Sequence, residues 1–119
     1  MKTIAAALFA CTLLLSGCGS SGGSDAAAPV KGVTIDIAIK DGKVTPQGKR
    51  VNVKVGQKIT LHITTDVGEE VHVHSEPEHE YELAAGDDVN ESFTLKVPGQ
   101  VAVEAHGLDV TILQLVVRP

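Results

Sequence analysis

The chain has 119 residues, with 10 lysines and arginines against 15 aspartates and glutamates, and its formal net charge is −5 at pH 7. This length favours a single domain, and the acidic balance argues against nucleic acids and anionic lipid surfaces as partners. Aromatic residues make up only 3% of the chain, so a folded core has to be built mainly from valine, isoleucine and leucine.

The N-terminus has the pattern of an export signal. Lys2 supplies a positive charge, and residues 4–15 form an almost unbroken apolar run. This run is shorter than the roughly 20 apolar residues that a membrane-spanning helix needs. We therefore predict a signal peptide over residues 1–17, which is removed from the mature protein.

The residues around the predicted cleavage site indicate lipid attachment. Leu15-Ser16-Gly17-Cys18 matches the bacterial lipobox, in which the cysteine is acylated and becomes the new N-terminus. Each buried CH₂ of an acyl chain contributes about 0.8 kcal/mol, and several chains give stable anchoring. The sequence thus predicts a lipoprotein of the cell envelope, attached to a membrane through Cys18 on the extracytoplasmic side. The alternative is an ordinary signal peptide with an incidental cysteine.

The mature chain is predicted to have no free thiol, because Cys11 leaves with the signal peptide and Cys18 carries lipid. No disulfide can then form, even in an oxidising compartment, so core packing has to stabilise the domain. The segment that follows, residues 18–29, is rich in glycine, serine and alanine. It is predicted to be a flexible tether ahead of a domain over residues 30–119.

The domain shows the period of two that is typical of β-strands. Apolar and polar residues alternate at 33–39, 51–55, 59–63, 71–73, 93–97 and 101–105, and Gly- or Pro-containing turns separate several of these runs. The last run, 110–117, is apolar on both faces, as in a central strand. About seven or eight short strands at intervals of about 8–12 residues predict an all-β fold, an antiparallel β-sandwich.

Histidines are concentrated in one stretch of the domain. His72 and His74 share one face of a predicted strand and lie about 6.5–7 Å apart along it, so both imidazoles can bind one metal ion. Neutral imidazole suits zinc or copper. His79 is predicted in the following loop, and His106 closes the next-to-last predicted strand. If that strand lies beside the strand of His72 and His74, three or four histidines form one site.

A simpler interpretation of this stretch is a solvated strand face, on which polar residues need no further role. We interpret His62 in this way, because it shares its face with Thr60 and Thr64. The glutamates of the histidine-rich stretch attract cations and also favour charged imidazolium, so a pH-responsive surface is a further hypothesis. These glutamates are Glu76, Glu78, Glu80 and Glu82.

The sequence does not predict an enzyme. Ser75 and His74 are adjacent, so on a strand they point to opposite faces and cannot form a nucleophile–base pair. Gly-rich phosphate loops, paired-carboxylate signatures and the CxxC motif are all absent from the sequence.

Two segments carry a family resemblance. Residues 70–74 (Glu-Val-His-Val-His) and the ending 115–119 (Leu-Val-Val-Arg-Pro) resemble small bacterial extracytoplasmic lipoproteins with a cupredoxin-like domain. The Pro98-Gly99 turn ahead of the penultimate strand agrees with this, and the resemblance covers about residues 30–119. It implies a Greek-key β-sandwich.

Blue-copper sites of that fold take a histidine late in one strand, then cysteine, histidine and usually methionine around the penultimate loop. The resemblance implies His72 or His74 at the first position and His106 at a later one. However, Ala105 stands about where the cysteine is expected, and Leu108 stands near the methionine position. Blue-copper electron transfer needs the thiolate, so we predict that this protein does not perform it.

The sequence therefore predicts a membrane-anchored binding module. It takes copper(II) or zinc, since nitrogen and oxygen ligands suit both ions. The candidate ligands are His72, His74, His79 and His106. The alternative is a metal-free interaction or envelope-structural module, whose sheet contacts another envelope protein.

Overall fold

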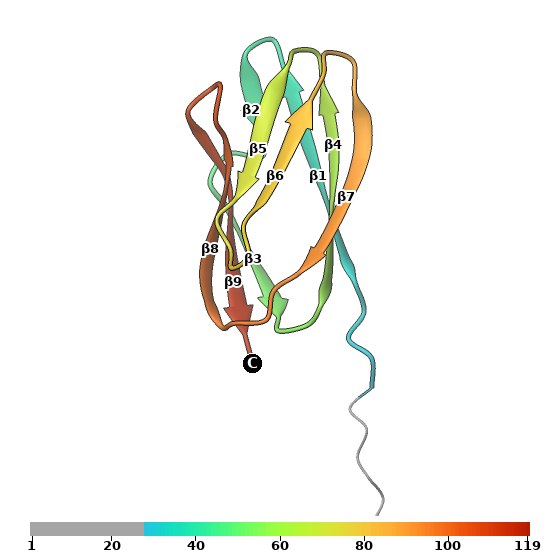
Figure 1. Ribbon diagram of the computed structural model, residues 1–119, viewed down its shortest axis with the longest axis vertical. Coiled ribbons are helices and arrows are strands. Elements are labelled where there is room, and N and C mark those ends of the chain that lie inside the picture. Colours follow the sequence, from blue (N-terminus) through green and yellow to red (C-terminus); the bar gives the residue numbers. More distant parts are fainter. Residues whose placement is uncertain (1–27) are drawn as a thin grey trace, which may run out of the picture.

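The computed structural model describes residues 28–119, in which nine β-strands form two sheets packed face to face (Figure 1). The predicted signal peptide, the predicted lipid attachment at Cys18 and most of the predicted tether lie outside the described residues. Within residues 28–119, no helix has the length and apolar character needed to cross a membrane.

The two sheets differ in size. The four-stranded sheet contains β1 (Val33–Lys40), β2 (Lys43–Thr45), β4 (Lys58–Thr65) and β7 (Asp88–Thr94), in the order β2-β1-β4-β7. The five-stranded sheet contains β3 (Lys49–Lys54), β5 (Glu69–Val73), β6 (His79–Leu83), β8 (Gly99–Ala105) and β9 (Val110–Arg118), in the order β3-β9-β8-β5-β6. The predicted all-β sandwich is therefore confirmed.

The core lies between the sheets and is aliphatic, as the composition indicates. In β1, for example, Ile35, Ile37 and Ile39 are buried while the residues between them are exposed. Strand β9 lies between β3 and β8, and its adjacent residues Ile112 and Leu113 are both fully buried, which confirms the predicted central strand. Complete burial of such a side chain contributes about 1.5–3 kcal/mol.

The strand pairing departs from the purely antiparallel sheets that the sequence predicts. β1 pairs with β4 in parallel, and β3 pairs with β9 in parallel, whereas the other pairs are antiparallel. A parallel pair needs a crossover connection. The chain supplies one by passing from β1 through β3 in the opposite sheet before it returns as β4.

Both ends of the described chain lie at the same end of the sandwich (Figure 1). The Gln57 side chain donates a hydrogen bond to the Lys31 carbonyl, and the Val55 amide donates one to the Arg118 carbonyl. The turn between β8 and β9 lies at the opposite end of β9 from Pro119. The segment toward the N-terminus thus leaves the domain far from this turn.

Candidate metal centre

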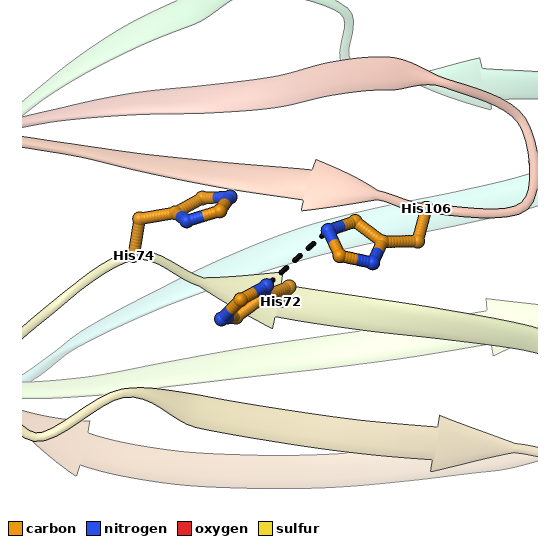
Figure 2. Close-up of side chains that lie close together, drawn as sticks. All are labelled: His72, His74 and His106. Atoms are coloured by element: carbon orange, nitrogen blue, oxygen red, sulfur yellow. Dashed lines mark hydrogen bonds between the residues drawn. The ribbon is translucent and has the colours of Figure 1, made fainter.

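Three histidines converge on the outer face of the five-stranded sheet (Figure 2). His72 lies on β5, His74 follows its last residue, and His106 follows the last residue of β8. β5 pairs with β8, with His72 opposite Glu104. Val71 and Val73 are fully buried in the core, so their neighbours His72 and His74 project outward, as the alternation predicts.

The spacing of the three rings suits a single ion. Nδ1 of His72 lies 3.2 Å from Nε2 of His106, and one ring nitrogen from each of the three histidines lies within 4.8 Å of the others. The His72 ring centroid lies 4.1 Å from that of His74 and 4.9 Å from that of His106. A tetrahedral ion with bonds near 2.0–2.1 Å holds its ligand atoms about 3.4 Å apart, so small ring rotations are enough.

Two of the three rings also contact carboxylates through one nitrogen. Nδ1 of His106 lies 3.0 Å from Oε1 of Glu70, and Nε2 of His74 lies 2.8 Å from Oε2 of Glu104. A carboxylate in this position fixes the tautomer and orientation of a metal-binding histidine, because it accepts the ring N–H and leaves the lone pair on the other nitrogen. His106 is thus oriented as such a ligand is, with Nδ1 on Glu70 and Nε2 toward His72, whereas in His74 the nitrogen on Glu104 is the one nearer His106 (Figure 2).

His72 is the buried member of the cluster, with only 7% of its surface exposed. Its Nε2 atom lies 3.3 Å from Glu78 and 3.9 Å from Glu80, but it makes no hydrogen bond with any described residue. The short distance to Glu78 is an ion-pair distance without hydrogen-bond geometry. Leaving a buried polar atom without a partner costs about 1–3 kcal/mol.

The carboxylates of this face perturb one another. The hydrogen bond from His74 lowers the pKa of Glu104, against the opposing effect of desolvation, and Thr111 donates a second hydrogen bond to Glu104. The pKa of Glu82 is raised by its hydrogen bond with Glu70 and by the charge of that neighbour. Negative charge is therefore dense around the three histidines.

A buried carboxylate holds the turn that carries His106. Oε1 of Glu69 accepts hydrogen bonds from the amides of Gly107, at 2.6 Å, and Glu70, at 2.9 Å. A Cβ on Gly107 would lie only 2.9 Å from the same oxygen, so a larger residue here would have to displace the Glu69 carboxylate. Our sequence analysis did not single out Glu69. The available signal was its position two residues before Val71, because alternation along a strand places both side chains on the same, buried side.

The structure brings together three of the four candidate histidines and leaves His79 apart. His79 is the first residue of β6 rather than a loop residue, and it pairs with the buried residue Val73. Its ring centroid lies 5.2 Å from that of Phe93 and 6.3 Å from that of Tyr81, to which it is nearly parallel. Its side chain therefore packs on the opposite face of the sheet from the cluster.

His62 lies on the outer face of the other sheet, and its surroundings are more specific than the solvated face that the sequence suggests. Its Nδ1 lies 2.8 Å from Asp36 on β1, and its Nε2 lies 2.7 Å from Asp88 on β7. These hydrogen bonds, with Asp36 the larger cause, raise the pKa of His62. Both contacts depend on strand pairing across the sheet, which local sequence does not reveal.

Solved structures of auracyanins and of amicyanin have a similar arrangement of strands. Auracyanin B aligns with a TM-score of 0.58 at 10% identity, covering 77% of this chain and 91% of that chain. Reduced auracyanin from Roseiflexus castenholzii aligns at 0.53 with 15% identity, covering 72% and 97%. A Cu(I) form of an amicyanin mutant aligns at 0.51 with 18% identity, covering 71% and 82%.

The domain has a cupredoxin-like fold. At these identities the likeness concerns the fold alone. Neither models of protein families nor the sequences of curated proteins match the chain.

The donor set of this cupredoxin-like domain differs from that of a blue-copper centre. The cysteines of the chain are Cys11 and Cys18, so residues 28–119 contain no thiolate ligand. Ala105 is fully buried beside Val71 and Val110 and offers no donor atom. The cluster supplies imidazole nitrogens with carboxylates around them, which fit zinc or copper(II) and not a thiolate-dependent site.

Proposed function

We propose that this domain binds one copper(II) or zinc ion on the outer face of its five-stranded sheet, through His72, His74 and His106. The observation that carries the proposal is the convergence of one nitrogen from each of the three rings within 4.8 Å. The role is capture or buffering of the metal at the cell surface, without blue-copper electron transfer.

The hydrogen-bond pattern assigns the ligand atoms. Nδ1 of His72 and Nε2 of His106 face each other, so these two nitrogens are the natural pair of ligands. The third ligand is a ring nitrogen of His74, whose Nε2 lies 2.8 Å from Glu104 before the metal binds. Metal ligands must be deprotonated, so binding displaces any proton held between the rings and becomes weaker as the pH falls.

The site is accessible enough for metal exchange. The side chains of His74 and His106 are 37% and 46% exposed. Three protein ligands leave a fourth position for water or an exchanging ligand, whereas structural zinc sites are closed by four protein ligands. This accessibility favours capture and release over a purely structural role.

The proposed location follows from the predicted lipid attachment at Cys18. Lipid on Cys18 anchors the chain to a membrane on the extracytoplasmic side. The segment that leads toward Cys18 leaves the sandwich at the end opposite the β8–β9 turn, which carries His106 (Figure 1). This arrangement lets that turn reach metal ions in the envelope while the flexible tether holds the opposite end of the domain nearer the membrane.

The test is a calorimetric titration of the full chain, purified in detergent without a histidine tag, with copper(II) and with zinc. We expect a tight binding event that the double variant His72→Ala/His74→Ala loses. His79→Ala is the matched control and keeps the event, because His79 packs on the other face of the sheet. Tight binding that persists in the double variant, or binding that occurs only at millimolar metal, contradicts the proposal. The metal-free interaction module then remains as the alternative.

A further inference from the structure

The second ring nitrogen of His72 lies in an acidic environment that the proposed metal site does not use. Its Nε2 atom is buried and makes no hydrogen bond with any described residue, in a side chain that is 9% exposed. Glu78 lies 3.3 Å and Glu80 3.9 Å from this atom. One oxygen from Glu70 and one from Glu80 lie within 4.8 Å of each other and of a His72 ring nitrogen.

A single N–H donor does not account for this arrangement. One carboxylate is enough to accept the hydrogen of a metal-bound imidazole, and the nearest one, Glu78, is not aligned to accept it. Glu78 and Glu80 both lie within 4 Å of the same buried nitrogen, and oxygens of Glu70 and Glu80 lie within 4.8 Å of each other, so these like charges repel one another. A cation at their centre removes this repulsion and also gives the unpaired nitrogen a partner.

We propose that a second divalent cation binds on this side of the ring, ligated by Nε2 of His72 and by carboxylate oxygens of Glu70 and Glu80. Glu78 lies close enough to complete the ligand set. The ion is zinc or copper(II), because magnesium and calcium prefer ligand sets made only of oxygen. The inference rests on the proposed function for the first ion and turns His72 into a bridge between the two.

The second ion binds with a defined release of protons. A neutral imidazole has one N–H, so coordination of both His72 nitrogens requires that this hydrogen leave as a proton to solvent. Glu70 has two carboxylate oxygens, and one of them lies 3.0 Å from the His106 ring. The second ion takes the other oxygen in place of the hydrogen bond between Glu70 and Glu82, so the contact of Glu70 with His106 is kept.

The experiment is a copper(II) titration of the full chain without a histidine tag, followed by electron paramagnetic resonance at neutral pH. The first equivalent gives a full-intensity signal. The second equivalent lowers the signal, because two copper(II) ions joined by one imidazolate couple their spins antiferromagnetically. Two uncoupled signals, or saturation at one equivalent, overturn the bridge. In the case of saturation at one equivalent, the first site of the proposed function still stands.

Two variants identify the ligands of the second site. We expect Glu80→Gln to weaken the second equivalent by more than about tenfold and to leave the first unchanged. Glu76→Gln is the matched control, since Glu76 is an exposed glutamate outside both ligand sets. Equal losses in both variants, or a loss of the first equivalent in Glu80→Gln, overturn the assignment. A His106→Ala chain that binds one ion fewer than the wild type, and binds the remaining ion in a Glu80-dependent way, supports both assignments, whereas a His106→Ala chain that binds as many ions as the wild type contradicts the first site.

Discussion

The outer faces of the two sheets carry histidines in opposite chemical situations. On the four-stranded sheet, His62 has an aspartate oxygen on each ring nitrogen, at 2.8 Å and 2.7 Å. On the five-stranded sheet, His74 and His106 each have one ring nitrogen on a glutamate, and their rings lie together with that of His72 (Figure 2). Both arrangements arise from the same alternation of strand residues.

The two situations differ in whether carboxylates contact one ring nitrogen or both. Two carboxylates stabilise the imidazolium, which has no lone pair left for a metal. One carboxylate accepts the single N–H of the neutral ring and leaves the other nitrogen as a donor to a metal. His62 is therefore expected to act as a charged link between strands, and the cluster as a metal ligand set.

The largest expected effect comes from removing one ligand of the cluster. We expect His106→Ala to weaken copper(II) binding by about 100-fold or more, since even the loss of a supporting carboxylate costs 10–100-fold. His62→Ala, which removes a histidine of similar exposure from the other sheet, should leave the affinity unchanged. Competition titrations against a chelator measure both. An equal loss in the two variants would show that the sheets do not differ in this way.

Metal binding should also stabilise the fold. At a free metal concentration about 100 times the dissociation constant, the stabilisation is about 2.7 kcal/mol, which raises the melting temperature of a domain of this size by roughly 11–22 °C. Calorimetric melting with and without zinc measures the shift. His62→Ala should show the same shift and His106→Ala should show almost none. A similar shift in both variants would mean that the metal acts elsewhere.

The turn that carries His106 gives the next effect. Gly107→Ala places a Cβ 2.9 Å from a buried oxygen of Glu69, so this carboxylate has to shift, and each backbone hydrogen bond that it loses costs about 0.5–1.5 kcal/mol. Urea unfolding measures the loss of stability, and metal titration tests whether the displaced turn also weakens binding. Gly68→Ala is the control, because its nearest contact, the Leu83 carbonyl at 3.7 Å, is an ordinary one. A Gly107→Ala variant with unchanged stability would show that the Glu69 carboxylate does not hold this turn tightly.

Loss of a supporting carboxylate should have a smaller effect on binding. Glu104→Gln removes the charge that holds His74, and we expect about a tenfold loss of metal affinity, at the low end of the range for such partners. Glu91→Gln, on β7 of the other sheet, is the matched control. Equilibrium titration with metal measures the affinity of both variants. An unchanged affinity in Glu104→Gln would show that Glu104 does not support metal binding.

The local sequence was sufficient to predict which side chains of each strand face the core. It was not sufficient to predict which strands pair with each other. The period of two predicted that Val71 and Val73 enter the core and that His72 and His74 leave it, because successive side chains of a strand alternate. The parallel pairing of β1 with β4 could not be read in this way, since it depends on a crossover through the other sheet. The short strand β2 has only three residues and gives no clear periodicity.

In the candidate site, too, side-chain direction could be predicted from the sequence but strand pairing could not. His106 reaches the cluster because β8 pairs with β5. The sequence analysis could not predict this pairing and only named it as the condition for a site of three or four histidines. His79 was placed in a loop, but the turn after His74 returns the chain at a register that pairs His79 with Val73 and points it inward. The aspartates around His62 come from strands 26 residues away in either direction, beyond the reach of any local pattern.

The smallest expected effect distinguishes the two faces by pH. The pKa of His62 lies above its ordinary value of 6.5 in the folded protein, because Asp36 and Asp88 favour the charged ring. The stabilisation from this link is therefore complete below pH 6.5 and is lost as the pH rises through the raised pKa of the folded state. Urea unfolding should show a stability gap between wild type and His62→Asn that is larger below pH 6.5 than well above it. The variant Asp36→Asn/Asp88→Asn, which keeps His62, should lose most of this pH dependence. A gap that widens with rising pH would mean that His62 is held as a neutral ring, and the contrast between the two sheets would then have to rest on metal binding alone.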